Sequence, residues 1–505
     1  MSSNQHIVML PVMAHGHLIP FLALARRIYE TTGFTITIAN TPLNIQHLRS
    51  TSNSSLPGDE PPRIQFAELP FCSVDHGLPP NTENTENLSL EQIGRFFCAT
   101  LDLKSPFRQL LSDITATEGK PPLCVISDFF FGWANEVAHS VGTVNLTFST
   151  SGAYGMLADL SVWLNLPHRR VADSYDFSVP GFPDEYRFHT TQLHQFIRKA
   201  DGTDSWSKFL QPQLSLSMKS LGWLCNTVEE IEPLSVEWLR NYIKVPVWPI
   251  GPLFPTRLLK RSSSTGSSLS SASHSGKQPG ISLEKCLKWL DLQSPGSVLY
   301  ISFGSQNTIT ASQMMELATG LEEAGKPFIW VIRAPIGFDR RGEFKAEWLP
   351  DGFEQRMSNT KRGLLVKNWA SQLEILCHKS TGVFLSHCGW NSVMESLSQG
   401  VPIIGWPMAA EQAYNSKMLV EEMGVSVELT RGIEGHISAK QVKESIDLAM
   451  DKNSSKGLRM KKNAVEMEKQ IREAISNEGE KKGSSIRAMD DLFKTLICRS
   501  LKSIN

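Results

Sequence analysis

The sequence lacks several features that identify common protein classes. Lysine and arginine total 50 against 51 aspartates and glutamates, so the chain has no basic excess to attract nucleic acid or an anionic membrane. No uninterrupted apolar run reaches the roughly 18 residues of a membrane helix. The N-terminus MSSNQ carries no positive side chain, and His15 and His17 interrupt the apolar stretch after it, which is unlike a signal peptide. We therefore expect a cytoplasmic protein with no integral membrane segment and no nucleic-acid partner.

Motifs of several cofactor enzymes are also missing. The eight cysteines form no CxxC pair and no cluster with metal-ligand spacing, which predicts reduced thiols and no metal site. No GxGxxG fingerprint follows the first predicted strand, and no GxxxxGK[ST] phosphate loop occurs. Dinucleotide oxidoreductases and kinases are thereby disfavoured, because each class depends on its glycine-rich loop.

The chain does contain enough apolar sequence for more than one core. It has 505 residues, of which 41% are hydrophobic, and a single core rarely supports that length. Short β-branched runs alternate with helical stretches, which predicts α/β domains. The stretch TGSSLSSASHS is too polar to pack a core and predicts a linker. We expect domains at 1–253 and 283–480, a linker at 254–282 and a terminal helix at 481–505.

The clearest functional pattern lies at 369–412. The apolar run TGVFLS at 381–386 predicts a buried strand, HCGW at 387–390 predicts a turn, and Asn391 is expected to open a helix. The start of such a helix offers unpaired backbone N–H groups and the positive end of its dipole to an anion. Three side chains can add hydrogen-bond donors there: His387, Asn391 and Ser392.

A base can be held near this anion site. Trp369 follows a predicted strand at 363–368, at the carboxyl end where α/β folds bind ligands. Its flat indole face suits stacking on a base. A phosphate site and a base site together indicate a nucleotide.

The stretch resembles the signature box of plant secondary-product glycosyltransferases, the UDP-sugar-dependent enzymes of glycosyltransferase family one. The resemblance rests on Trp369, Gln372, the HCGWNS run, Glu395, the GVP and WP elements, and the final Glu411-Gln412 pair. It implies a GT-B architecture, in which two Rossmann-like domains face each other across a cleft and the terminal helix packs back on the first domain.

The resemblance also assigns roles to individual residues. The positions implied for UDP binding are Ser305, Trp369, Ala370, Gln372, His387, Asn391, Ser392 and Glu395. Those implied for the sugar are Thr150, Trp390, Glu411 and Gln412, with Thr147, Ser149 and Ser151 as alternatives to Thr150. Glu395 has a structural alternative, because Ser392 and Glu395 have the spacing of a capping box.

A candidate base lies near the N-terminus. An apolar strand at 6–12 is followed by a predicted turn at 13–19 and a helix from Pro20, and this turn contains His17. The pattern Gly-His-x-x-Pro matches the family motif in which the histidine is the general base, and imidazole suits that role near neutral pH. His15 is a nearby competitor.

A carboxylate that could orient this base is Asp128, which follows the buried strand LCVIS. An aspartate after a strand is often only a helix cap. Here it matches the family's Ser-Asp motif, in which the carboxylate orients the imidazole and stabilises the imidazolium. We predict a His17–Asp128 dyad.

The expected reaction is inverting transfer of a sugar from a UDP-sugar to an acceptor hydroxyl, without a bound cofactor. The diphosphate would be met by a helix dipole, backbone N–H groups and neutral donors rather than a cation. The final Gln412 is associated with glucose in the family. Four aromatic residues beside Asp128, namely Phe129, Phe130, Phe131 and Trp133, favour a hydrophobic phenolic or terpenoid acceptor, although some must be core.

The sequence leaves three alternative functions open. The enzyme could form a C-glycosidic bond or extend an existing sugar chain. It could also be a catalytically silent sugar-nucleotide-binding protein. We expect a monomer in each case.

Overall fold

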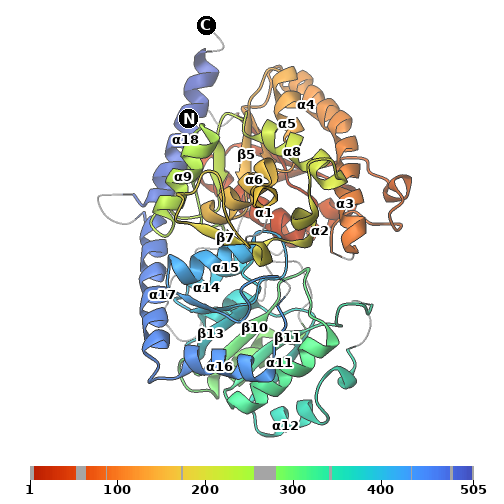
Figure 1. Cartoon of the computed structure of the whole chain (residues 1–505). Helices are drawn as coiled ribbons and strands as arrows, with labels where there is room; N and C mark the ends of the chain where they lie inside the picture. Colours follow the sequence, from red (N-terminus) through yellow and green to blue (C-terminus); the bar gives the residue numbers. More distant parts are fainter. Residues whose placement is uncertain are drawn as a thin grey trace.

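The computed structural model describes residues 5–52, 64–86, 88–171, 175–254, 280–339, 344–433, 435–477 and 482–502. Two parallel sheets occupy separate lobes, drawn one above the other in Figure 1. The first has seven strands in the order β3-β2-β1-β4-β5-β8-β9, and the second has six in the order β12-β11-β10-β13-β14-β15. This confirms the predicted α/β architecture of two Rossmann-like domains.

The elements of the first lobe are short, with most strands buried. The strands are β1 (His6–Leu10), β2 (Thr35–Asn40), β3 (Ile64–Glu68), β4 (Cys124–Asp128), β5 (Asn145–Ser149), β8 (Trp223–Cys225) and β9 (Val247–Pro249), with an antiparallel hairpin of β6 (Asp176–Ser178) and β7 (Arg187–His189). The helices are α1 (His15–Thr32), α2 (Pro42–Ser52), α3 (Leu90–Ala99), α4 (Lys104–Glu118), α5 (Trp133–Ser140), α6 (Ala153–Asn165), α7 (Gln195–Lys199), α8 (Ser205–Ser217) and α9 (Pro233–Ile243).

The second lobe repeats the pattern. Its strands are β10 (Val298–Ser302), β11 (Phe328–Ile332), β12 (Gly363–Lys367), β13 (Thr381–Ser386), β14 (Ile403–Gly405) and β15 (Ser426–Glu428). Its helices are α10 (Leu283–Asp291), α11 (Ala311–Ala324), α12 (Phe353–Asn359), α13 (Gln372–Cys377), α14 (Trp390–Leu397), α15 (Gln412–Glu421), α16 (Ala439–Met450) and α17 (Ser455–Ala474).

The beginning of α1 differs from the sequence prediction. The sequence pattern predicts a turn at 13–19 and a helix from Pro20, but the helix begins at His15 and encloses Pro20. The prediction relied on the preference of proline for the first helical turn. Proline lacks the N–H that would pair with the carbonyl of Gly16, so an interior position becomes acceptable when that carbonyl finds another donor.

The chain returns to the first lobe at its end. Helix α18 (Ser484–Lys502) runs beside that lobe, whereas α17 runs beside the second (Figure 1). Phe493 of α18 packs edge-on against Phe34, with ring centroids 5.8 Å apart, and Trp248 donates a 2.8 Å hydrogen bond to Asp491. The apolar face of the helix therefore completes a core of the first lobe.

Two further sequence predictions concern segments and membrane helices. Most of the proposed linker, residues 255–279, lies outside the described residues. In the described ranges, no helix combines the length and apolarity needed to cross a membrane.

Candidate active site

His17 and Asp128 form a hydrogen-bonded pair where β1 and β4 end. These strands are neighbours in the sheet, so the start of α1 and the end of β4 meet. His17 Nδ1 lies 2.7 Å from Asp128 Oδ2, and because a carboxylate only accepts, Nδ1–H is the donor. The Asp128 side chain is fully buried, whereas that of His17 is 20% exposed. The dyad leaves Nε2 of His17 as the free nitrogen.

The surroundings of His17 change its pKa in opposite directions. Burial lowers the pKa, but the charge and hydrogen bond of Asp128 and the charge of Glu411 outweigh this effect, so the pKa lies above its usual value. The imidazolium form is thus stabilised, while Nε2 remains without a partner on Asp128. This combination suits proton transfer.

His15 and Thr150 occupy distinct places around this pair. His15 Nε2 lies 3.1 Å from Glu86, so it belongs to another hydrogen-bonded pair. Thr150 Oγ1 lies 3.4 Å from His17 Nδ1. Of the alternatives, Thr147 instead hydrogen-bonds Ser217 and Ser220 in the core of the lobe.

The aromatic residues after Asp128 divide into two groups. The rings of Phe129 and Phe130 lie 6.1 and 5.9 Å from the His17 ring. Phe131 and Trp133 are buried in the core. Phe97 continues the first group, 5.0 Å from Phe130. Phe129 and Phe130 therefore form an apolar wall beside the His17 ring, and Phe129 is itself buried in the core.

The anion cradle predicted from the sequence lies at the turn between β13 and α14 of the second lobe. The predicted strand at 381–386 matches β13, and the chain turns through Cys388, whose φ is 62°. The first helical hydrogen bond of α14 runs from the backbone N–H of Val393 to the carbonyl of Gly389. The backbone N–H groups before Val393 have no partner within the helix and point out of its N-terminal end. His387 stands beside this end, 8% exposed.

Three predicted ribose and phosphate residues form a cluster. Gln372 Nε2 donates to Ser392 Oγ at 2.9 Å and to Glu395 Oε2 at 2.6 Å, and its carbonyl accepts from the Tyr300 hydroxyl. The capping-box alternative for Glu395 is wrong, because α14 begins at Trp390 with no side-chain cap.

Trp369 and Ala370 differ in what they expose. Trp369 is half-buried, and the structure shows no aromatic ring against its indole within the described ranges. Ala370 is buried at 3% exposure in the core beneath β10 and β13. Trp369 can present a side-chain face to a base, whereas Ala370 can offer only its backbone.

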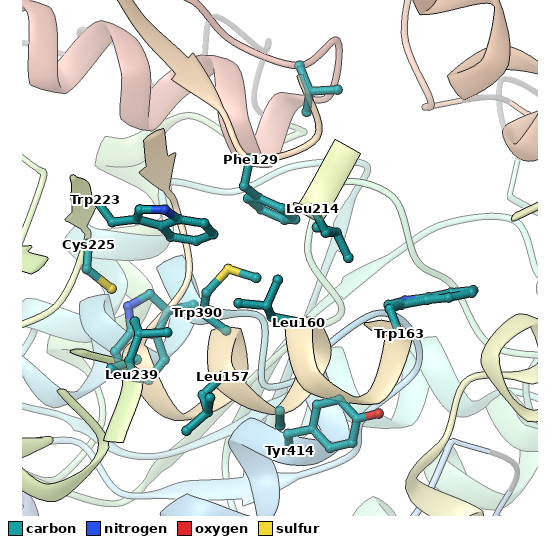
Figure 2. Close-up of a cluster of buried hydrophobic side chains, with 14 of the residues drawn as sticks. Phe129, Leu157, Leu160, Trp163, Leu214, Trp223, Cys225, Leu239, Trp390 and Tyr414 are labelled. Atoms are coloured by element: carbon teal, nitrogen blue, oxygen red, sulfur yellow. The ribbon is translucent and has the colours of Figure 1, made fainter. Parts of the chain in front are cut away.

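The two half-sites meet where the lobes touch. Asn391 Nδ2 donates to the carbonyl of Gly16, the residue before His17, at 3.0 Å. Trp390 Nε1 donates to the carbonyl of Asn226 at 2.6 Å. Figure 2 shows Trp390 among Trp223, Cys225 and Leu239 of the first lobe. The dyad and the anion cradle are therefore adjacent.

This geometry agrees with comparisons to known proteins. Residues 4–255 match the family model "Glycosyltransferase, N-terminal domain", and residues 284–472 match "UDP-glucoronosyl and UDP-glucosyl transferase". The chain is 40% identical to UDP-glycosyltransferase 92A1 of Arabidopsis thaliana over 99% of each chain. It is 44% identical to crocetin glucosyltransferase 3 of Crocus sativus, over 89% of this chain and 91% of that one. The chain belongs to the plant UDP-glycosyltransferases.

Solved structures of such transferases have the same GT-B fold. UGT73P12 of Glycyrrhiza uralensis, complexed with glycyrrhetinic acid 3-O-monoglucuronide, matches with a TM-score of 0.81 at 26% identity, over 99% of this chain and 97% of that one. TcCGT1 in complex with UDP matches with a TM-score of 0.74 at 28% identity, over 98% and 99%.

Two of the predicted sugar residues of this UDP-glycosyltransferase, Trp390 and Glu411, contact the first lobe. Glu411 Oε1 accepts from Ser151 of the first lobe at 3.5 Å and from Asn415 at 3.4 Å. Gln412 Oε1 accepts from the backbone N–H groups of Met408 and Ala409, which leaves its amide nitrogen as a donor. The Trp390 indole N–H is already bound to Asn226, so a sugar would meet another part of that residue.

Sequence reasoning missed Arg333, which follows β11. Its guanidinium donates at 3.0 Å to the carbonyl of Asn368, the residue before Trp369. It also donates at 3.3 Å to the carbonyl of Asn307, in the loop after Ser305. Burial and the charge of Arg333 lower the pKa of His387 to about 4. Arg333 therefore places a positive charge near His387. A lone basic residue directly after a buried strand was the available signal.

Two other features of the transferase bear on its chemistry. All eight cysteines are free. Among the described residues, no three His, Cys, Asp or Glu side chains come together as metal ligands.

Proposed function

We propose that this UDP-glycosyltransferase is an inverting O-glucosyltransferase that moves glucose from UDP-glucose to a hydroxyl of a hydrophobic small molecule. One observation carries the proposal: the Asp128-paired His17 follows Gly16, whose carbonyl contacts Asn391 at the start of α14. A base and an anion cradle stand side by side, as transfer between an acceptor and a nucleotide sugar requires.

In this mechanism, His17 Nε2 takes the proton from the acceptor hydroxyl as the oxygen attacks the anomeric carbon. Asp128 holds the imidazole in the tautomer that leaves Nε2 free, and its charge stabilises the imidazolium. The carbon–oxygen bond to UDP breaks on the opposite face of the sugar, so the configuration inverts. Phe129 and Phe130 would hold an apolar acceptor beside the base.

The second lobe would bind the donor and stabilise the leaving diphosphate. Trp369 would stack on uracil, and Gln372 and Glu395 would bind the ribose. The N-terminal end of α14, with His387, Asn391 and Ser392, would receive the phosphates, and Ser305 would add a donor. The sugar would lie among Thr150, Trp390, Glu411 and Gln412. The free enzyme would need no cofactor beyond its co-substrate.

The names of relatives support the donor and the acceptor class. They include crocetin glucosyltransferase 3, a scopoletin glucosyltransferase of Nicotiana tabacum and a UDP-glucose flavonoid 3-O-glucosyltransferase of Fragaria ananassa. We propose a phenolic or terpenoid acceptor for this chain. The free thiols suit a cytoplasmic enzyme, which we propose to act as a monomer.

The decisive experiment measures UDP release from UDP-glucose with a panel of phenolic and terpenoid acceptors. Product mass and linkage analysis separate O-glucosides from C-glucosides and from extended sugar chains. His17→Ala should lower turnover at least about a hundredfold while UDP binding stays near normal. UDP binding without turnover of any acceptor would favour a silent binding protein. Full turnover by His17→Ala would show that His17 is not the general base.

A further inference from the structure

Asn226 joins the two lobes through two groups, and a third group anchors it within the first lobe. It follows β8 of the first lobe and is 3% exposed. Its backbone carbonyl accepts from Trp390 Nε1 at 2.6 Å, its Nδ2 donates to Asn391 Oδ1 at 3.3 Å, and its Oδ1 accepts from the backbone N–H of Leu253 at 3.1 Å. One residue of the first lobe thus contacts the side chains of two consecutive residues at the start of α14, Trp390 through its backbone and Asn391 through its side chain.

The direction of these hydrogen bonds is fixed at both ends. Leu253 offers an N–H, which can only donate, so the oxygen of the Asn226 amide must face it and the nitrogen must face Asn391. Gly16 offers a carbonyl, which can only accept, so the nitrogen of the Asn391 amide must face Gly16. Two backbone groups of opposite character therefore determine both amide orientations, which distances alone would not distinguish.

The Gly16 carbonyl is available because of Pro20. In α1 the N–H of residue 20 would bond to the carbonyl of residue 16, and proline has no N–H. The carbonyl that is left without a helical donor belongs to Gly16, the residue that precedes His17. The Asn391 amide nitrogen carries two hydrogens, so one can serve Gly16 while the other remains for an anion at the cradle.

We propose that Asn226 is a positioning residue for the donor site, which fixes the orientation of the Asn391 amide and so couples the diphosphate cradle to the start of the His17 helix. The proposal rests on the proposed function, because it assigns to Asn391 a phosphate of the UDP-sugar. Without Asn226, the Asn391 amide keeps the Gly16 carbonyl but loses the donor that holds its oxygen, so the oxygen can turn toward the phosphate, where a donor is needed.

Asn226→Asp is the sharpest variant. It keeps the oxygen that Leu253 needs and the backbone carbonyl that Trp390 needs, but it places an acceptor opposite Asn391. We expect UDP to bind about tenfold more weakly, measured by titration calorimetry. The matched control is Asn135→Asp, a buried first-lobe asparagine that donates to the Lys219 carbonyl, and it should bind UDP as the wild type does.

A double-mutant cycle separates positioning from general damage. If Asn226 acts through Asn391, Asn226→Asp should weaken UDP binding less than twofold when Asn391 is already alanine. An equal loss in both backgrounds, or no loss in either, would overturn the proposal. Failure of the wild type to bind UDP at all would instead overturn the proposed function, so the two failures are distinguishable.

Pro20→Ala gives an independent test that does not touch Asn226. It restores an N–H that competes with Asn391 for the Gly16 carbonyl, and it removes a proline from a helix interior. We expect the melting temperature to stay or rise while kcat falls several-fold. Unchanged kcat together with unchanged UDP affinity would contradict the coupling, even if Asn226→Asp failed to fold.

Discussion

A Cβ atom added to Gly304 would lie 2.6 Å from Nε2 of His387, too close for any side chain, so the His387 ring packs directly against the bare backbone of Gly304. Gly304 follows β10 and has a φ of 73°, which disfavours other residues. His387 follows the neighbouring strand β13. The bare backbone at 304 therefore makes room for the imidazole at the anion cradle.

Gly304→Ala should displace His387 and weaken UDP binding about tenfold or more. The ring cannot yield as a flexible chain end would, and the displaced donor would be lost to the phosphate. Titration calorimetry with UDP measures the effect. Gly296→Ala is the matched control, since residue 296 has a φ of 65° but no atom within 4 Å of the added carbon. Equal loss in both variants would point to backbone strain rather than to His387.

Asp128→Asn should shift the pH dependence of transfer as well as its rate. The base must be neutral, so activity falls as the pH drops through the pKa of His17, which lies above its usual value. The variant removes the charge that raises this pKa but keeps the burial that lowers it, so the acidic limb should move to lower pH. The plateau of kcat should fall at least about a hundredfold. A pH–rate profile whose acidic limb does not move would contradict the dyad.

The strands and the signature-box residues could be predicted from the sequence, because their information is local. β13 matches the predicted range since a continuous β-branched run has few alternatives. The start of α1 could not be predicted, because the Gly16 carbonyl that Pro20 leaves unpaired finds its donor, Asn391, in the other lobe. Asn226 was missed for the same reason: its partner lies 165 residues away, and no periodicity marks such a contact.

Trp390→Phe should destabilise the junction between the lobes. The indole N–H donates to the buried carbonyl of Asn226, and phenylalanine leaves that acceptor unpaired, which costs about 1–3 kcal/mol. Urea unfolding of the two proteins measures the difference. Trp289→Phe on α10 is the control, because that half-buried indole has no hydrogen bond in the described part of the chain. A smaller loss at Trp390 than at Trp289 would contradict the role of the N–H.

The side chain of Glu232, the residue before α9 in the sequence, reaches the N-terminal end of α6. Its carboxylate accepts from the backbone N–H groups of Ala153 and Tyr154 at 3.1 and 2.9 Å and from the Thr227 hydroxyl. The α6 cap Gly152 has no side chain to do so. Burial raises the pKa of Glu232 to about 7, although these hydrogen bonds oppose the shift.

Glu232→Gln should therefore change how stability depends on pH. Between about pH 4.5 and 7 the unfolded chain releases the Glu232 proton while the folded chain retains it, so this residue lowers wild-type stability as the pH rises. The variant has no such loss, and its stability relative to the wild type should increase across that window by on the order of 3 kcal/mol. Urea unfolding at pH 5 and pH 7.5 measures this difference. Glu237→Gln, an exposed position on α9, should show no such trend. A constant difference between Glu232→Gln and the wild type would mean that Glu232 ionises in the folded protein as it does in the unfolded chain.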